Sequence, residues 1–227
     1  MASQARRNSI LEVLEAEGVG KISREFENVT LLREDVIVQA GEKNAYLYFP
    51  TTAVISFIGQ TGQGATIEVW SVGHEGAAGI SAILGQEPPF SGVVQIPGDA
   101  VRVKTATLKK HFERSRTFRD AVGGYLHYLL TQTSCLGICN NLHPLVQRFS
   151  RWLLVMEKRV GTRSLHFTHD SIAALLGTRR ATISVAAAAL QSAGAIRYTP
   201  GAIIIESRRK LARSACGCHK AMNVEFP

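Results

Sequence analysis

The most informative segment of this chain is Thr168-His-Asp-Ser-Ile-Ala-Ala-Leu-Leu-Gly177-Thr-Arg-Arg-Ala-Thr-Ile-Ser-Val-Ala-Ala-Ala-Ala-Leu-Gln191. Thr168 is a good N-cap for a first short helix, and Gly177 can adopt the positive φ that ends this helix and redirects the chain. A second helix follows, with Arg179 and Arg180 at its start and apolar residues at helical spacing behind them. The pattern predicts a helix-turn-helix whose second helix enters the DNA major groove. An ordinary helical hairpin in a core is the alternative, which the arginine placement disfavours.

The net charge of +8 is concentrated in the same part of the chain. Residues 144–227 contain 13 Lys and Arg against 4 Asp and Glu, whereas residues 1–143 contain 13 against 14. A cationic segment attracts phosphates and releases their counterions. We therefore predict double-stranded DNA as the partner, because a merely solvated basic face would not explain this asymmetry.

Composition bounds the class of protein. At 227 residues the chain is long enough for two modest domains, and 45% apolar and 19% charged residues are typical of a globular protein. The sequence shows no apolar run of membrane-spanning length and no apolar secretory core in its first residues, so we expect a cytoplasmic protein without a membrane partner. Four cysteines are too few and too clustered for a disulfide framework, which fits a reducing compartment.

The first half of the chain changes from a short amphipathic helix at 8–20 to β-type runs. These runs are short and are separated by Gly-rich turns, which indicates an antiparallel sandwich or jelly roll. They span residues 35–39, 45–49, 53–58, 65–72, 92–96 and 100–104.

A long helix is predicted from about 117 to 141, after a short one at 108–112. Its apolar surface is too large for a helix that stands alone, so we expect it to pack on a second copy of itself. Burial inside its own domain is the alternative. The predicted dimerisation residues are spaced by three or four positions: Phe118, Val122, Leu126, Leu129 and Leu136.

The last third predicts a winged helix-turn-helix. Pro144 opens a helix over 145–160, a small strand follows at 164–167, and residues 195–206 form a hairpin that turns at Pro200-Gly201. The predicted fold class is therefore α+β, in three parts: a sensor roll with its N-terminal helix (1–115), a dimerisation helix and hinge (116–143), and a DNA-binding domain (144–227).

This order of parts resembles the Crp/Fnr family of bacterial transcription factors. The resemblance rests on Tyr48–Ser56, Val72–Gly76, Cys139–His143, Thr168–Val185 and Ala215–Cys218. It implies a cyclic-nucleotide-binding-like β-roll and a homodimer on a pseudo-palindromic operator, which regulates transcription initiation by RNA polymerase.

The recognition helix matches the family unevenly. Arg180 stands where the family's well-known receptors place a guanine-reading arginine, but Ala181 replaces their base-contacting glutamate and Val185 their second arginine. The operator should therefore differ, with Val185 offering only an apolar contact to a thymine methyl. The candidate DNA-binding residues are Thr168, His169, Thr178, Arg179, Arg180, Thr182, Ser184 and Tyr198.

The sensor roll lacks the charges that a cyclic nucleotide needs. Family receptors supply a carboxylate for the ribose and a cation for the phosphate, whereas this chain has Ile80 and Phe90 at the corresponding places and no Lys or Arg in residues 44–101. We expect no cyclic AMP effect. The regulator is either independent of an effector or responds to an unidentified small molecule.

The cysteines do not indicate a metal centre. Cys135 and Cys139 are one helical turn apart and could meet near a dimer axis, but small buried hydrophobes are the favoured interpretation. Cys216, Cys218 and His219 have ligand chemistry, but only one residue separates the two thiols, and metal sites usually show two or more. We predict neither a metal nor a cofactor.

Motifs for catalysis are also missing from the sequence, which has no Gly-x-Ser-x-Gly, His-Glu-x-x-His or P-loop lysine, so we do not expect an enzyme. The alternative function is a small-molecule or redox-sensing binding module that regulates a protein partner without touching DNA.

Overall fold

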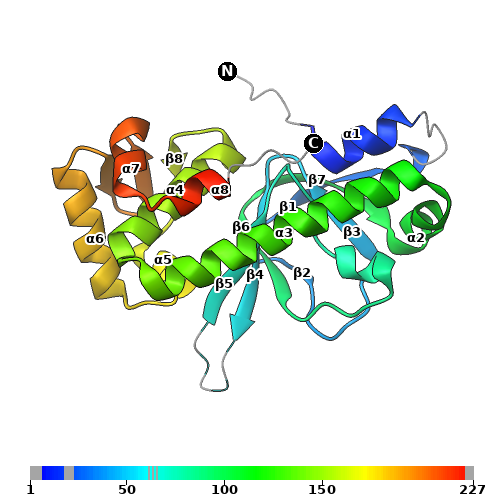
Figure 1. The fold of residues 1–227 in the computed structure, drawn as a ribbon, viewed down its shortest axis with the longest axis horizontal. Coiled ribbons are helices and arrows are strands. Elements are labelled where there is room, and N and C mark those ends of the chain that lie inside the picture. The colour runs from blue at the N-terminus through cyan, green and yellow to red at the C-terminus, as the bar shows by residue number, and fades with distance from the viewer. Residues whose placement is uncertain (1–6, 18–22, 61, 63, 65, 223–227) are drawn as a thin grey trace. The chain divides into compact units, whose positions relative to one another are not determined.

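The computed structural model describes residues 7–17, 23–60, 62, 64 and 66–222. The chain divides into two compact units. Of the described residues, those within 7–57 and 71–129 belong to unit 1, and those within 58–70 and 130–222 belong to unit 2. The predicted α+β class, with an N-terminal β-domain, a long helix and a C-terminal helix-turn-helix, is confirmed (Figure 1).

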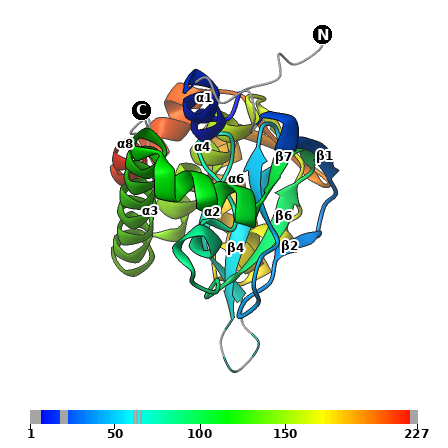
Figure 2. The same ribbon diagram turned by 90° about the vertical axis from the view of Figure 1, so that its right-hand side faces the viewer.

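Two antiparallel sheets form the β-roll, as Figure 2 shows. The first has the order β1-β7-β3, with β1 at Glu27–Leu31, β7 at Gly98–Lys104 and β3 at Tyr46–Pro50. The second has the order β2-β6-β4-β5. Its strands are Val36–Val38, Ser91–Ile96, Val54–Gln60 and Thr66–Val72.

The six predicted β-runs thus all contain strands, and the sequence analysis missed only β1 among the strands of the roll. Polar residues alternate with apolar ones in β1, which pairs with β7 in a register that places Glu27 opposite Arg102. The Arg102 guanidinium contacts the Glu27 carboxylate at 2.8 Å. The roll is filled by fully buried aliphatic and aromatic side chains, including Leu47, Phe49 and Val94.

Helix α1 (Ser9–Ala16) begins at Asn8, whose side-chain oxygen accepts hydrogen bonds from the backbone N–H groups of Ile10 and Leu11. The Asn8 amide nitrogen donates to the carbonyls of Pro50 and Gly76, so this cap is tied to the roll. The end predicted for this helix, at 18–20, lies outside the described residues. Two short 3-10 helices, η1 (Ser23–Glu25) and η2 (Ile80–Leu84), complete the loops.

Two further helices follow the roll. The short helix predicted at 108–112 is α2 (Thr105–Arg114), and the long helix is α3 (Arg116–Leu142), one residue longer at each end than expected. Residues 116–129 of α3 belong to unit 1 and residues 130–142 to unit 2.

The remaining elements of unit 2 form the winged helix-turn-helix. Trp152 of α4 packs edge-on against Phe167 in its core, with ring centroids 4.9 Å apart. The three-stranded sheet has the order β8-β10-β9. The elements are α4 (Leu145–Val160), β8 (Ser164–Leu165), α5 (His169–Leu175), α6 (Arg180–Ser192), β9 (Ile196–Thr199), β10 (Ala202–Ile205), α7 (Arg208–Ser214) and α8 (Cys218–Ala221).

Among the described residues, no single helix has both the length and the apolarity to cross a membrane. Taken together, α5 and α6 pass that test by length and composition, although the pair is bent by 108°.

Candidate nucleic-acid interface

Helices α5 and α6 form the predicted helix-turn-helix. Thr168 caps α5 through a capping box: its hydroxyl accepts from the Ser171 N–H, and the Ser171 hydroxyl lies 3.1 Å from the Thr168 backbone nitrogen, which donates to it. Gly177 has a φ of +60°, as the turn requires. The angle of 108° between the two helices is typical of the DNA-binding motif.

The inner faces of the two helices are made of small and aliphatic side chains. Ala173 of α5 is only 5% exposed, and its lack of bulk allows close packing against α6. The buried residues are Ile172, Ala173 and Leu175 on α5 and Ile183, Ala186, Ala187 and Leu190 on α6. Burial of this face leaves the opposite face of α6 free to contact another molecule.

The exposed end of α6 carries the predicted readers. Arg179, Arg180, Thr182 and Val185 are exposed, and Val185 keeps 71% of its accessible surface. The Arg180 Nε lies 3.6 Å from the Asp170 carboxylate, but both side chains are about two-thirds exposed. Such a pair contributes little to stability, so the Arg180 guanidinium can exchange Asp170 for a nucleotide.

His169, Ser184 and Tyr198 contact one another. The His169 Nδ1 lies 2.9 Å from the Ser184 hydroxyl, and the imidazole stacks on the Tyr198 ring with centroids 4.0 Å apart. Burial, and after it the charge of Arg180, lowers the pKa of His169, against a smaller effect of Asp170. Near neutral pH the imidazole is therefore uncharged, and it links α5, α6 and the wing.

The wing is held against α6 by its backbone. The N–H of Tyr198 donates to the Gln191 side chain at 2.9 Å, and Arg197 pairs with Glu206 across the hairpin at 2.7 Å. Gly201 has a φ of +81° at the predicted Pro200-Gly201 turn. These contacts fix the position of the wing beside α6.

Sequence analysis missed two supporting groups beneath this surface. Arg148 of α4 donates to the Leu176 carbonyl at the end of α5, at 2.6 Å. Glu157, also on α4, lies 3.0 Å from the Arg208 guanidinium and 4.0 Å from that of Arg163. Both residues are charged side chains in the predicted helix 145–160. The spacing of apolar residues in that helix does not indicate which groups these charged side chains contact.

The predicted seam of the long helix needs a correction. Phe118 and Val122 are fully buried and Leu136 is 8% exposed, so these three lie in the chain's own core, as the alternative interpretation held. The Phe118 ring packs on those of His111 and Phe112. Leu126 and Leu129 are half-buried.

A different face of α3 is open. Its large exposed apolar side chains are Leu130 (64%), Ile138 (50%) and Leu142 (74%). Small or polar exposed residues lie near these positions in the helix, among them Ser134 and Gly137. We call Leu130, Ser134, Ile138 and Leu142 the outer seam. It was missed because α3 is apolar on two faces, and sequence periodicity cannot decide which face is covered by the chain itself.

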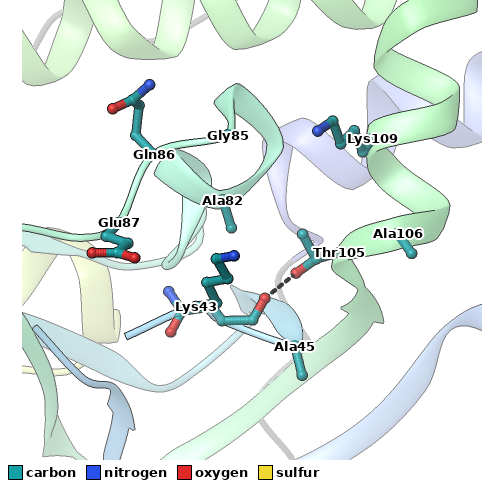
Figure 3. A pocket seen from close by; sticks show the side chains of 10 residues that line it. Lys43, Ala45, Ala82, Gly85, Gln86, Glu87, Thr105, Ala106 and Lys109 are labelled. Atoms are coloured by element: carbon teal, nitrogen blue, oxygen red, sulfur yellow. Dashed lines mark hydrogen bonds between the residues drawn. The ribbon is translucent and has the colours of Figure 1, made fainter. Parts of the chain in front are cut away.

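The sensor roll contains a cavity of about 790 Å³ beside η2 and α2 (Figure 3). Lys43, Lys109 and Glu87 bring charge to its lining, and the Thr105 hydroxyl donates to the Asn44 carbonyl at 2.7 Å. Both lysines lie just outside the cation-free stretch 44–101. Ile80 and Phe90, which replace the family's charged pair, do not belong to this lining.

Comparison with known proteins gives a consistent result. A family model of the Crp-like helix-turn-helix domain matches residues 147–214. No curated protein sequence matches the chain significantly. Among solved structures, a Crp/Fnr-family regulator from Eubacterium rectale is similar at 16% identity and a TM-score of 0.71, over 91% of this chain and 97% of that one.

Two further structures show the same fold. FixK2 from Bradyrhizobium japonicum has a TM-score of 0.74 at 15% identity, over 85% of this chain and 98% of that one. The c-di-GMP-responsive global regulator CLP from Xanthomonas campestris has a TM-score of 0.66 at 14% identity, over 87% and 98%. The TM-scores show that this chain shares the fold of these proteins. The family match identifies residues 147–214 as a Crp-like helix-turn-helix domain.

Proposed function

Because residues 147–214 are a Crp-like helix-turn-helix domain on a chain with the Crp/Fnr fold, we propose that the protein is a homodimeric transcription regulator that reads a pseudo-palindromic operator. The helix-turn-helix match and the shared fold support the predicted resemblance to the Crp/Fnr family, and a regulator of this kind would not be an enzyme. The dimer, operator, effector and polymerase contact are our proposals.

One observation carries the proposal: the N-terminal end of α6 presents two exposed arginines on a helix whose other face is buried. Arg180 would form a bidentate contact with a guanine, and Val185 an apolar contact with a thymine methyl. Arg179, Thr178 and Thr182 would contact phosphates. Thr168, His169, Ser184 and Tyr198 act mainly by positioning these groups, since their side chains are engaged with one another or with the cap.

The outer seam of α3 fits a second copy of the same chain. In an antiparallel or parallel pair related by two-fold symmetry, Leu130 and Ile138 of each copy would be removed from water together. Two recognition helices are what a pseudo-palindrome requires, because each half-site lies about one helical turn of DNA from the other. The family resemblance implies RNA polymerase as a further partner. We propose that the protein acts in the cytoplasm, where it would meet DNA and the polymerase.

For the effector, we propose that cyclic AMP has no role. Ile80 and Phe90 provide no charge for a ribose or a phosphate. The expected result is no change in melting temperature and no gain in operator affinity at millimolar cyclic AMP. A clear stabilisation would contradict this part of the proposal and leave the DNA-binding part untouched.

The central experiment selects binding sites from random duplex DNA with the full-length protein. We expect an enriched two-fold symmetric site, which is then measured by gel shift over a salt series. The affinity should fall steeply with salt, since phosphate contacts release counterions. Failure to enrich any site, together with indifference to duplex DNA at low salt, would favour the regulator of a protein partner.

A further inference from the structure

Four potential metal ligands from distant parts of the sequence meet in unit 2. Cys139 and His143 lie one turn apart at the end of α3, and Cys216 and Cys218 flank Gly217 at the start of α8. One ligand atom from each residue lies within 4.8 Å of all the others. Cys139 and Cys216 are buried and the other two are half-buried. Sequence spacing gave little sign of this cluster, because each half contributes only two ligands.

The distances suit a tetrahedral ion. The sulfurs of Cys139 and Cys216 are 3.4 Å apart, and the Cys218 sulfur lies 3.9 Å from the His143 Nδ1. Zinc binds thiolate at about 2.3 Å and imidazole at about 2.1 Å, so the edges of its ligand tetrahedron are about 3.5–3.8 Å. The other ligand atoms lie within 4.8 Å of one another, so side-chain shifts of at most about 1 Å would complete such a site.

The surrounding structure holds the C-terminal segment in place. Met222, at the end of α8, packs on Cys135 and Leu136 of α3. The Gln132 amide lies 3.4 Å from the Met222 carbonyl oxygen, to which it donates. The four-residue cluster does not include His219, whose Nδ1 lies 2.8 Å from the Cys216 carbonyl oxygen. The approach of Cys216 and Cys218 to α3 thus rests on several independent contacts.

A buried guanidinium, that of Arg151, lies close to this cluster and carries a positive charge that is uncompensated within the part of the chain that the structure describes. Arg151 of α4 is 2% exposed, and its Nε and Nη2 have no hydrogen-bond partner among the described residues. Its Nη1 has only a weak acceptor, the Met222 sulfur at 3.2 Å. A buried cation of this kind requires a nearby anion, and three thiolates with one divalent ion carry a net charge of −1.

We propose that Cys139, Cys216, Cys218 and His143 bind one Zn²⁺ ion per chain, through three Sγ atoms and the Nδ1 of His143. On binding, the three thiols pass their protons to solvent and form S–Zn bonds, with no change of oxidation state. The closed Cys₃His set is that of a structural site. It fixes the segment after α7 to the end of α3. This inference goes beyond DNA binding and does not depend on it.

A disulfide between Cys139 and Cys216 is the competing explanation for the short sulfur contact. It would leave Arg151 without an anion and would give His143 and Cys218 no role. The two explanations differ in thiol count, since the zinc site retains four free thiols after chelation and denaturation, and the disulfide retains two.

The test begins with the full-length protein purified under reducing, oxygen-free conditions, and measures metal content by plasma mass spectrometry. We expect one zinc per chain, with Cys216→Ser and Cys218→Ser falling to background. Cys135→Ser is the matched control, because Cys135 is a buried cysteine on the same helix outside the ligand set, and it should keep its zinc. Cobalt in place of zinc should give the visible absorption of a tetrahedral thiolate complex.

A second measurement needs no variant, which matters if the serine variants fail to fold. Alkylation of the wild-type protein is followed by mass spectrometry with and without a chelator. We expect zinc to protect Cys216 and Cys218, and chelation to expose them. A wild-type chain that binds no zinc after reconstitution, that holds iron with sulfide instead, or that shows the same alkylation in both states would overturn the proposal.

Discussion

Helices α6 and α3 both bury one face in their own chain, yet they expose different chemistry. The exposed start of α6 carries arginines, threonine and a single valine, whereas the outer seam of α3 carries Leu130, Ile138 and Leu142. A cationic face suits a hydrated polyanion, and an apolar one suits another protein surface. This difference supports our proposal that one chain binds DNA through α6 and a copy of itself through α3.

The largest expected effect is on the outer seam. In the double variant Leu130→Asp/Ile138→Asp, two pairs of like charges would face each other across the two-fold axis, so the protein should sediment as a monomer and lose its affinity for a two-site operator. Analytical ultracentrifugation and gel shift measure both. Val36→Asp, at an exposed valine of β2, is the control and should remain dimeric. A double variant that stays dimeric would show that the outer seam is not the dimer interface.

The inner face of α3 should respond in the opposite way. Phe118→Ala removes a fully buried ring that packs on His111 and Phe112, and we expect a loss of about 3–5 kcal/mol in the free energy of unfolding. Urea denaturation measures the loss, and sedimentation under native conditions should still show a dimer. If the variant dissociated into monomers without a loss of stability, Phe118 would belong to the dimer interface and not to the core.

The two arginines of α6 should separate base reading from phosphate binding. Arg180→Ala should cost about 1–3 kcal/mol on the selected operator and relax the preference at one base pair, because a bidentate contact is lost. Arg179→Ala should weaken specific and random duplexes alike and reduce the salt slope. Arg116→Ala, 88% exposed at the start of α3, is the charge-matched control. Equal losses on both duplexes for Arg180→Ala would rule out base reading.

The smallest effect concerns His169. Its pKa is lowered in the folded protein, so below the ordinary value of 6.5 the unfolded chain binds a proton that the folded chain does not. Stability should therefore fall as the pH drops below about 6.5, and the fall should end below the folded pKa. Melting curves of wild type and His169→Gln between pH 7.5 and 5.5 isolate this contribution. Identical pH dependence in both would show that the imidazole does not titrate with unfolding.

The helix-turn-helix was predictable because its signals are local. Thr168, Gly177 and the alternation of alanine with aliphatic residues each specify backbone geometry within a few residues. The roll was also predictable, apart from β1, whose polar sequence is stabilised by its partner strand and not by its own pattern.

Long-range pairings were not predictable. Both the inner and the outer face of α3 carry large apolar side chains, and only the burial of Phe118, Val122 and Leu136 shows which face the chain itself covers. The approach of Cys216 to Cys139 joins positions 77 residues apart. His169 could be placed at a cap, but its contacts with Ser184 and Tyr198 depend on how α5, α6 and the wing fold together.

The alanine-rich composition of α6 has a thermodynamic consequence. Alanine has no rotamers to lose, so ordering this helix on a duplex would freeze few torsions beyond those of Arg179 and Arg180. The entropy of association should then be dominated by displaced cations and water. In calorimetric titrations at increasing salt concentration, the favourable entropy of DNA binding should decrease while the binding enthalpy stays nearly constant.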